Sequence, residues 1–267
     1  MGIEIEKGEE SMKRTVINLA VGVFLWSLPC SVSAHFGMVI PSDSMVMQGE
    51  KRVIRVVTSF SHPMTMMGMD LVKPFRFGVL CRGKKMNLQS DLEETTVMDK
   101  KAWFIDYKIQ LPGVYQFFME PSPYWEPAEE GYIIHYTKTI VSAFGAEKGW
   151  DDPVGMKTEI IPLTRPFGVY SGNVFQGIVM LNGKPVPYSE VEVEFYNRDG
   201  KAEPINQYFV TQVIKADSNG LFTYGVPRAG WWGFAALNQA DHKIKNQGVD
   251  KNVELGAVIW VEFKKWR

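Results

Sequence analysis

The sequence has very few cysteines and almost no net charge. It contains 2 Cys among 267 residues, and its formal net charge is -1. A net charge this close to zero suggests neither nucleic acid nor an anionic membrane surface as a partner, and we expect no nucleic-acid partner. Cys30 lies in the leader described below, which leaves Cys81 without an intramolecular disulfide partner. We expect Cys81 to be a buried apolar side chain in a strand.

Several common catalytic and metal-binding motifs are also missing from the sequence. There is no Cys-x-x-Cys pair and no His-Glu-x-x-His, which argues against a structural zinc site or a zinc protease. There is no Gly-x-Ser-x-Gly elbow and no phosphate-binding loop. The sequence therefore predicts a protein that is not an enzyme.

The one long apolar run lies near the N-terminus, at residues 16–28, after Lys13 and Arg14 and before the small residues of segment 31–34. This pattern is typical of a signal peptide, and the run is too short to span a membrane. We expect cleavage after Ala34 and a periplasmic protein. The acidic residues before Met12 are unusual ahead of a signal peptide, so Met12 is the more natural start than Met1.

Cleavage after Ala34 would leave His35 as the first residue. Its free amine and its imidazole can then close a chelate ring on one metal ion, because imidazole suits zinc, copper, iron and nickel. The alternative is that His35 becomes the first residue by accident of processing.

Short segments with apolar and polar residues in alternation dominate the first half after the leader, at residues 52–57, 103–109 and 114–119. Alternation with period two, bounded by Gly, Pro and Asp, predicts β-strands. The second half repeats this pattern in about seven short strands, with turns at Asn182-Gly183 and at residues 217–220. The sequence predicts an all-β protein with two β-sandwich domains, residues 35–165 and residues 171–267, the second immunoglobulin-like.

A loop rich in methionine follows the second histidine. His62 is followed by Pro63 and by four Met within residues 64–69, among them Met64 and Met66. Thioethers are soft ligands that suit copper(I), which makes His62, Met64 and Met66 candidate metal ligands. The alternative is that these methionines fill the core, since Met is an adaptable apolar side chain.

The third candidate histidine, His135, follows a proline-rich loop that holds four carboxylates and several aromatic residues, at residues 120–134. Functional sites often lie on such loops of a rigid β scaffold. His135 is a candidate ligand, and a hydrogen-bonded core histidine is the alternative. His242 lies among charged residues and is expected at the surface.

Several segments together resemble the NikK-like periplasmic components of cobalt and nickel uptake systems, which work with energy-coupling-factor (ABC-type) transporters. They are residues 34–37, 121–135, 149–151, 158–166, 175–177, 183–187 and 227–237. The resemblance covers nearly the whole chain after the leader. It implies a periplasmic protein that binds a divalent transition metal, nickel or cobalt, and whose partners are membrane metal-transporter subunits. The second domain also resembles carboxypeptidase-regulatory modules of exported proteins.

Three other functions stay open at this point. Copper handling, as a periplasmic carrier or tolerance protein, would use His35 and the methionine-rich loop. An oxidative enzyme with a histidine brace would need the terminal amine, a second histidine and copper. A structural or adhesive β-sandwich would bind no metal, which is the default when two β modules are judged by fold alone.

Overall fold

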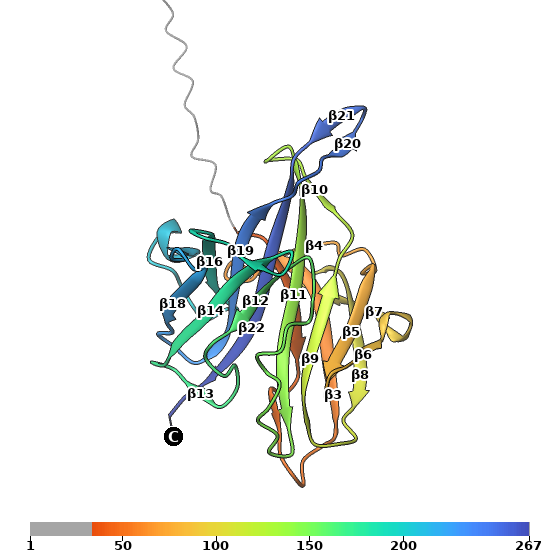
Figure 1. Cartoon of the computed structure of the whole chain (residues 1–267), viewed down its shortest axis with the longest axis vertical. Helices are drawn as coiled ribbons and strands as arrows, with labels where there is room; N and C mark the ends of the chain where they lie inside the picture. The colour runs from red at the N-terminus through yellow and green to blue at the C-terminus, as the bar shows by residue number, and fades with distance from the viewer. Residues whose placement is uncertain (1–33, 267) are drawn as a thin grey trace, which may run out of the picture. The chain divides into compact units, whose positions relative to one another are not determined.

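The computed structural model describes residues 34–266, and Figure 1 shows that they form an all-β protein. In this range the only helical elements are two short 3-10 turns, η1 (Gln89–Asp91) and η2 (Gln207–Phe209). No helix within it is long and apolar enough to cross a membrane. The expected signal peptide, with its start at Met1 or Met12, lies outside the described residues apart from Ala34. The predicted all-β class is confirmed.

An 11-stranded sheet runs through the middle of the protein (Figure 1). Its order is β17 (Gln212–Lys215), β16 (Glu190–Phe195), β19 (Gly230–Gln239), β22 (Val253–Lys264), β11 (Gly131–Ala143), β9 (Gly113–Glu120), β5 (Arg76–Cys81) and β6 (Lys84–Asn87). Three short strands pair at its side, namely β2 (Met45–Val46), β10 (Tyr124–Glu126) and β13 (Val169–Tyr170).

The centre of this sheet joins the two halves of the sequence. Strand β11 pairs in parallel with β22, from Tyr132 opposite Val253 to Thr139 opposite Trp260. The expected boundary at residues 166–170 contains β13, which also pairs with β22. The two expected sandwiches therefore share one sheet, and backbone pairing continues through the segment between them.

The first sandwich is closed by a five-stranded sheet on one side. It consists of β1 (Phe36–Pro41), β3 (Val53–His62), β8 (Lys100–Lys108), β7 (Glu93–Val97) and the short β4 (Met67–Met69). Apolar side chains from this sheet and from β5, β9 and β11 form one buried cluster. Cys81 belongs to this cluster and is 8% exposed, which confirms the expectation that it is buried.

A four-stranded sheet closes the second sandwich. It consists of β12 (Thr158–Pro162), β14 (Val174–Leu181), β15 (Lys184–Pro185) and β18 (Leu221–Gly225), and a separate hairpin is formed by β20 (Ile244–Asn246) and β21 (Val249–Lys251). Val191, Val193 and Phe195 share one face of β16 and enter the core, as their alternation predicts. The Asn182-Gly183 turn has positive φ at both residues, which is the geometry that this dipeptide favours.

The strand that the sequence predicts at residues 209–216 begins later in the structure. Residues 209–216 look like one strand, but Phe209 lies in η2 and β17 begins at Gln212. The reason is the side chain of Asn206, which accepts a hydrogen bond from the Tyr208 amide and starts the 3-10 turn.

Candidate metal site

His35 and His62 are brought together by strand pairing. His35 precedes β1 and His62 ends β3, and these strands are antiparallel, with Phe36 opposite Ser61. Residues 35 and 62 are therefore the next pair of the ladder. Their ring centroids lie 4.4 Å apart at an interplanar angle of 51°. The register of two strands thus places side by side two imidazoles that are far apart in the sequence.

The His35 imidazole is held by a carboxylate. Its Nε2 lies 2.8 Å from Oε2 of Glu126, and both side chains are 11% exposed. The other oxygen of Glu126 accepts a hydrogen bond from the Ala128 amide, which fixes the carboxylate. Burial, and then the neighbouring His62, lower the pKa of His35 to about 4. The neutral ring donates from Nε2 to Glu126, which leaves the lone pair of Nδ1 free.

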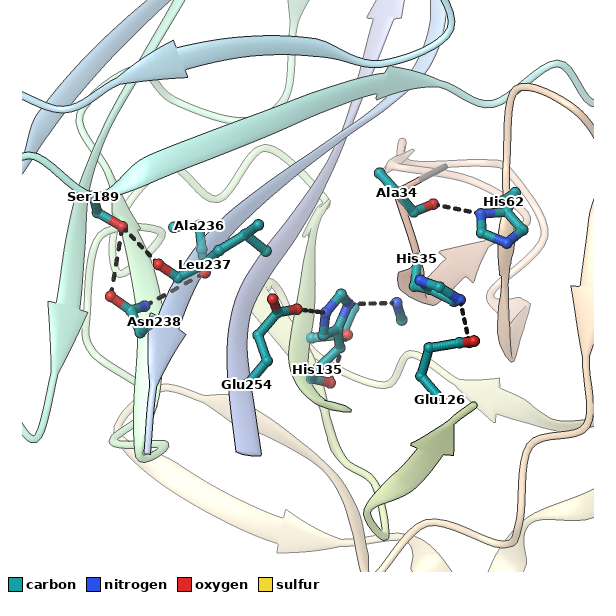
Figure 2. Close-up of polar contacts among 12 residues, drawn as sticks. Ala34, His35, His62, Glu126, His135, Ser189, Ala236, Leu237, Asn238 and Glu254 are labelled. Carbon is teal, nitrogen blue, oxygen red and sulfur yellow. Dashed lines mark hydrogen bonds and ion pairs between the residues drawn. The ribbon is translucent and has the colours of Figure 1, made fainter. Parts of the chain in front are cut away.

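The His62 imidazole contacts the backbone at the point of expected cleavage. Its Nδ1 lies 2.8 Å from the carbonyl oxygen of Ala34. A carbonyl can only accept, so Nδ1 carries the proton, and in the neutral ring Nε2 has the free lone pair. Figure 2 shows His62, Ala34 and His35 around this point, with Glu126 on the opposite side of the His35 ring.

His135 lies in the same neighbourhood, but both of its ring nitrogens are engaged. The Gly37 amide donates to Nδ1 at 3.2 Å, and Nε2 lies 3.4 Å from Oε1 of Glu254. The side chain is 1% exposed. Its ring covers Gly256, where a Cβ would lie 2.3 Å from the His135 Cδ2. His135 therefore has the contacts of a hydrogen-bonded core histidine, the alternative that its sequence position left open.

Aromatic side chains separate these groups from water. Phe60 lies between the histidines, with ring centroids 5.6 Å from His35 and 5.7 Å from His135. Tyr124 packs against Phe60 at 4.9 Å. A small cavity of about 40 Å³ remains beside Phe60, Tyr124 and His135. Groups in such an apolar setting interact more strongly than they do in water.

The structure does not bring Met64 to the imidazoles. Met64 is 8% exposed and belongs to the core cluster of the second sandwich, with Phe195 and Trp232. Met66 is half-buried in the turn between β3 and β4 and has a φ of 58°. The position of Met64 fits the core-filling alternative. His242 lies at the surface, as expected, and contacts Asp241.

Within residues 34–266 no group of three or more His, Cys, Asp or Glu side chains is placed to hold a metal ion. The donors that the contacts leave free are one nitrogen each on His35 and His62. A terminal amine on His35 would add a third nitrogen without a third residue. In a processed chain, three nitrogen donors of the kind that divalent transition metals accept would thus come from two residues.

The sequence family is clear from comparison with known proteins. Residues 32–240 match the family described as "Domain of unknown function (DUF4198)". The chain belongs to the DUF4198 family. The match leaves the resemblance to NikK-like transport components a prediction. No curated protein matches the sequence.

Three solved structures illustrate what this DUF4198 chain is similar to. The D0-D1 domain of intimin shares 13% identity, covers 84% of this chain and 99% of its own, and has a TM-score of 0.23. A putative carbohydrate binding protein from Bacteroides uniformis shares 11%, with coverages of 84% and 98% and a TM-score of 0.25. An Escherichia coli alpha-2-macroglobulin fragment shares 9%, with coverages of 84% and 71% and a TM-score of 0.25. These likenesses bear on neither ligand nor partner.

Two carboxylates of the site have no clear signal in the sequence. Glu126 is one of four carboxylates in a loop, where such groups are usually solvated. Glu254 reaches His135 because β22 pairs with β11, across more than 100 residues of sequence. The local signals that exist are Gly37 and Gly256, which allow the backbone to approach His135 closely.

Proposed function

We propose that the chain, processed after Ala34, is a periplasmic protein that binds a divalent transition metal, nickel or cobalt, and passes it to a membrane importer. The observation that carries this proposal is the contact between His62 Nδ1 and the Ala34 carbonyl. It puts the bond expected to be cut directly beside the second imidazole.

Cleavage would change the chemistry at this point. The amide nitrogen of His35 is bonded to the same carbon as the Ala34 carbonyl oxygen, so hydrolysis of that bond leaves a free amine close to His62. An amide nitrogen is a poor ligand, whereas an amine is a good one once it has lost its proton. The amine, Nδ1 of His35 and one imidazole nitrogen of His62 would then supply three nitrogen donors.

The surroundings of His35 support this assignment. Metal-ligating histidines usually donate their other ring N–H to a carboxylate, which fixes the tautomer and the ring orientation. Glu126 does this for Nε2 of His35. Because burial and His62 lower the pKa of the His35 ring to about 4, the imidazole needs no deprotonation to bind a metal near neutral pH.

Three nitrogen donors leave coordination positions open, as a carrier that must release its cargo requires. Such nitrogen-rich sites suit nickel(II) and copper(II), with copper bound more tightly by the general affinity order. Nickel or cobalt delivery would therefore depend on metal supply as well as on geometry. Copper carriage is the second candidate, favoured by this same donor set. Membrane metal-transporter subunits are the proposed partners in both cases.

Calorimetric titration of nickel(II), cobalt(II) and copper(II) into the chain that starts at His35 tests this function. We expect His35→Ala and His62→Ala each to weaken binding by at least about 10-fold, because each removes a ligand. The control His242→Ala, at an exposed residue, should bind like the wild type.

Failure of all three metals to bind, or unchanged binding in both ligand variants, would overturn the proposal. Anaerobic titration with copper(I) separates the two candidates. If the wild type binds copper(I) and Met66→Leu does not, copper handling is favoured. If the protein binds nickel or cobalt selectively, uptake of those metals is favoured.

A further inference from the structure

The loop between β16 and β17 exposes three large apolar side chains close together in the sequence. Ile205 is 81% exposed, Tyr208 is 88% exposed and Phe209 is 48% exposed. Apolar groups gathered in this way usually mark a surface that contacts a membrane or another molecule. The loop follows β16 in Figure 1, at the left of the molecule.

Hydrogen bonds hold this loop in one shape. The Asn197 side chain donates to the Ala202 carbonyl at 2.9 Å and accepts from the Ala202 amide at 2.9 Å. Asn206 accepts from the Tyr208 amide at 3.0 Å and starts η2. Ala202 and Val210 are buried at the two ends of the exposed stretch. The exposed side chains are therefore held outward on an anchored base.

The base of the loop is bonded to the turn that follows His62. The Asn197 amide donates to the Pro63 carbonyl at 3.1 Å, and the Asn197 side chain donates to the Met64 carbonyl at 3.2 Å. The Met64 amide in turn donates to Glu194 at 3.3 Å. One backbone hydrogen bond and two side-chain hydrogen bonds thus join the base of the loop to the turn beside the candidate metal site.

Basic side chains accompany the exposed residues. The exposed basic side chains here are Arg198, Lys201 and Arg228, and the exposed acidic ones are Asp199 and Glu203. Lys201 is paired with Asp199 at 3.5 Å. In the part of the chain that the structure describes, neither Arg198 nor Arg228 forms an ion pair with a carboxylate. The Arg228 guanidinium lies over the Phe195 ring, 4.4 Å from its centroid, which leaves its charge without a carboxylate partner.

We propose that this loop is a membrane anchor that places Ile205, Tyr208 and Phe209 in the interfacial layer of an anionic phospholipid bilayer. An aliphatic residue beside aromatic ones, held on a protruding turn, fits the interface between headgroups and acyl chains. Arg198 and Arg228 bind headgroup phosphates. A protein partner would instead have to supply a groove for Ile205 and Tyr208, whose side chains are 81% and 88% exposed. The base of the docked loop would remain hydrogen-bonded to the turn that follows His62.

Flotation with vesicles tests the anchor, without added metal and with the chain starting at His35. Vesicles of phosphatidylethanolamine with about a quarter of phosphatidylglycerol supply the anionic surface. We expect the wild type to float with them and the double variant I205S/Y208S to lose at least about 10-fold in partitioning. Both side chains are almost fully exposed, so the variant should keep the wild-type melting temperature.

Val249→Ser is the matched control, since Val249 is 57% exposed on the separate β20–β21 hairpin. It should float like the wild type. Arg198→Gln should bind less than the wild type at low salt, and this difference should shrink as salt is raised, because salt screens the attraction that Arg198 supplies. No flotation of the wild type, or equal flotation of the wild type and I205S/Y208S, would overturn the anchor. Because no metal is present, that result leaves the proposed metal binding untouched.

Discussion

Nδ1 of His62 lies 2.8 Å from the carbonyl oxygen of Ala34, on the peptide bond that the leader pattern marks for cleavage. In the uncut chain this carbonyl holds the His62 ring, and the His35 nitrogen is an amide. Processing at this bond would remove the carbonyl and supply an amine at the same place. On our proposal the site is completed by maturation rather than by folding alone.

Glu126 should affect metal affinity through His35. Glu126→Gln keeps the size of the side chain but weakens the hydrogen bond from Nε2 of His35, so the ring loses basicity and orientation. We expect metal affinity to fall by about 10- to 100-fold. Titration calorimetry measures this, with Glu130→Gln as the control, since the Glu130 side chain is 76% exposed and pairs with Lys251. Equal affinities for the wild type and Glu126→Gln would contradict the role of Glu126.

Gly256 should be intolerant of any side chain. A Cβ at Gly256 would lie 2.3 Å from Cδ2 of His135, so Gly256→Ala must displace the ring and its bonds to Gly37 and Glu254. We expect a loss of about 1–3 kcal/mol in the free energy of unfolding, measured with urea. Gly225→Ala is the control, because nothing lies within 4 Å of the Cβ it would add. A fully stable Gly256→Ala would show that the ring packs elsewhere.

Local patterns were sufficient to predict the fold class and many of the strands. The alternation of Val191, Val193 and Phe195 places them in the core, and the Asn182-Gly183 turn has the geometry expected of that pair. These features depend on neighbouring residues, which a sequence displays directly. The candidate histidines were also visible as residue types in suggestive segments.

Long-range pairing is what the sequence did not reveal. The parallel register of β11 with β22 brings Glu254 to His135, and the register of β1 with β3 puts His35 beside His62. Met64 shows the opposite effect, since it is adjacent to the site in sequence but points into another core. Proximity in a β-sheet is fixed by register, and single-sequence patterns carry little information on register.

The contribution of Glu194 to the free energy of unfolding should fall as pH rises. Burial raises its pKa to about 7 from a reference value of 4.5. Below pH 4.5 both states carry the proton. Between pH 4.5 and about 7 only the unfolded chain loses it, so the folded state loses up to about 1.4 kcal/mol per pH unit.

Glu194→Gln imitates the neutral acid and should remove most of this slope. We expect it to match the wild type at low pH and to be more stable near neutral pH, by urea unfolding at both. Some slope should remain, because burial also raises the pKa of Glu192, to about 8. Glu190→Gln, at an exposed position of the same strand, is the control. An unchanged slope in Glu194→Gln would contradict the assignment.

Lys138 and Glu159 form a buried ion pair that should be costly to break. Nζ of Lys138 lies 2.8 Å from Glu159, and the two side chains are 0% and 5% exposed. Lys138→Met leaves the carboxylate uncompensated and should cost about 3–5 kcal/mol in urea unfolding. Adding Glu159→Gln should restore part of the loss.

The exposed pair of Lys157 and Asp241, at 3.1 Å, provides the comparison. Lys157→Met should change the free energy of unfolding by less than about 1 kcal/mol. If Lys138→Met were no more harmful than Lys157→Met, the buried pair would contribute little to stability.

The central claim is that the terminal amine of His35 is a metal ligand. Adding one residue before His35 tests this claim most directly. Nickel(II) and copper(II) would be titrated into the chain that starts at His35 and into the same chain with one extra N-terminal Ala. The extension keeps every side chain and turns the amine of His35 into an amide. We predict that the chain starting at His35 binds metal and that the extended chain loses most of its affinity. Equal binding by both chains would contradict the account.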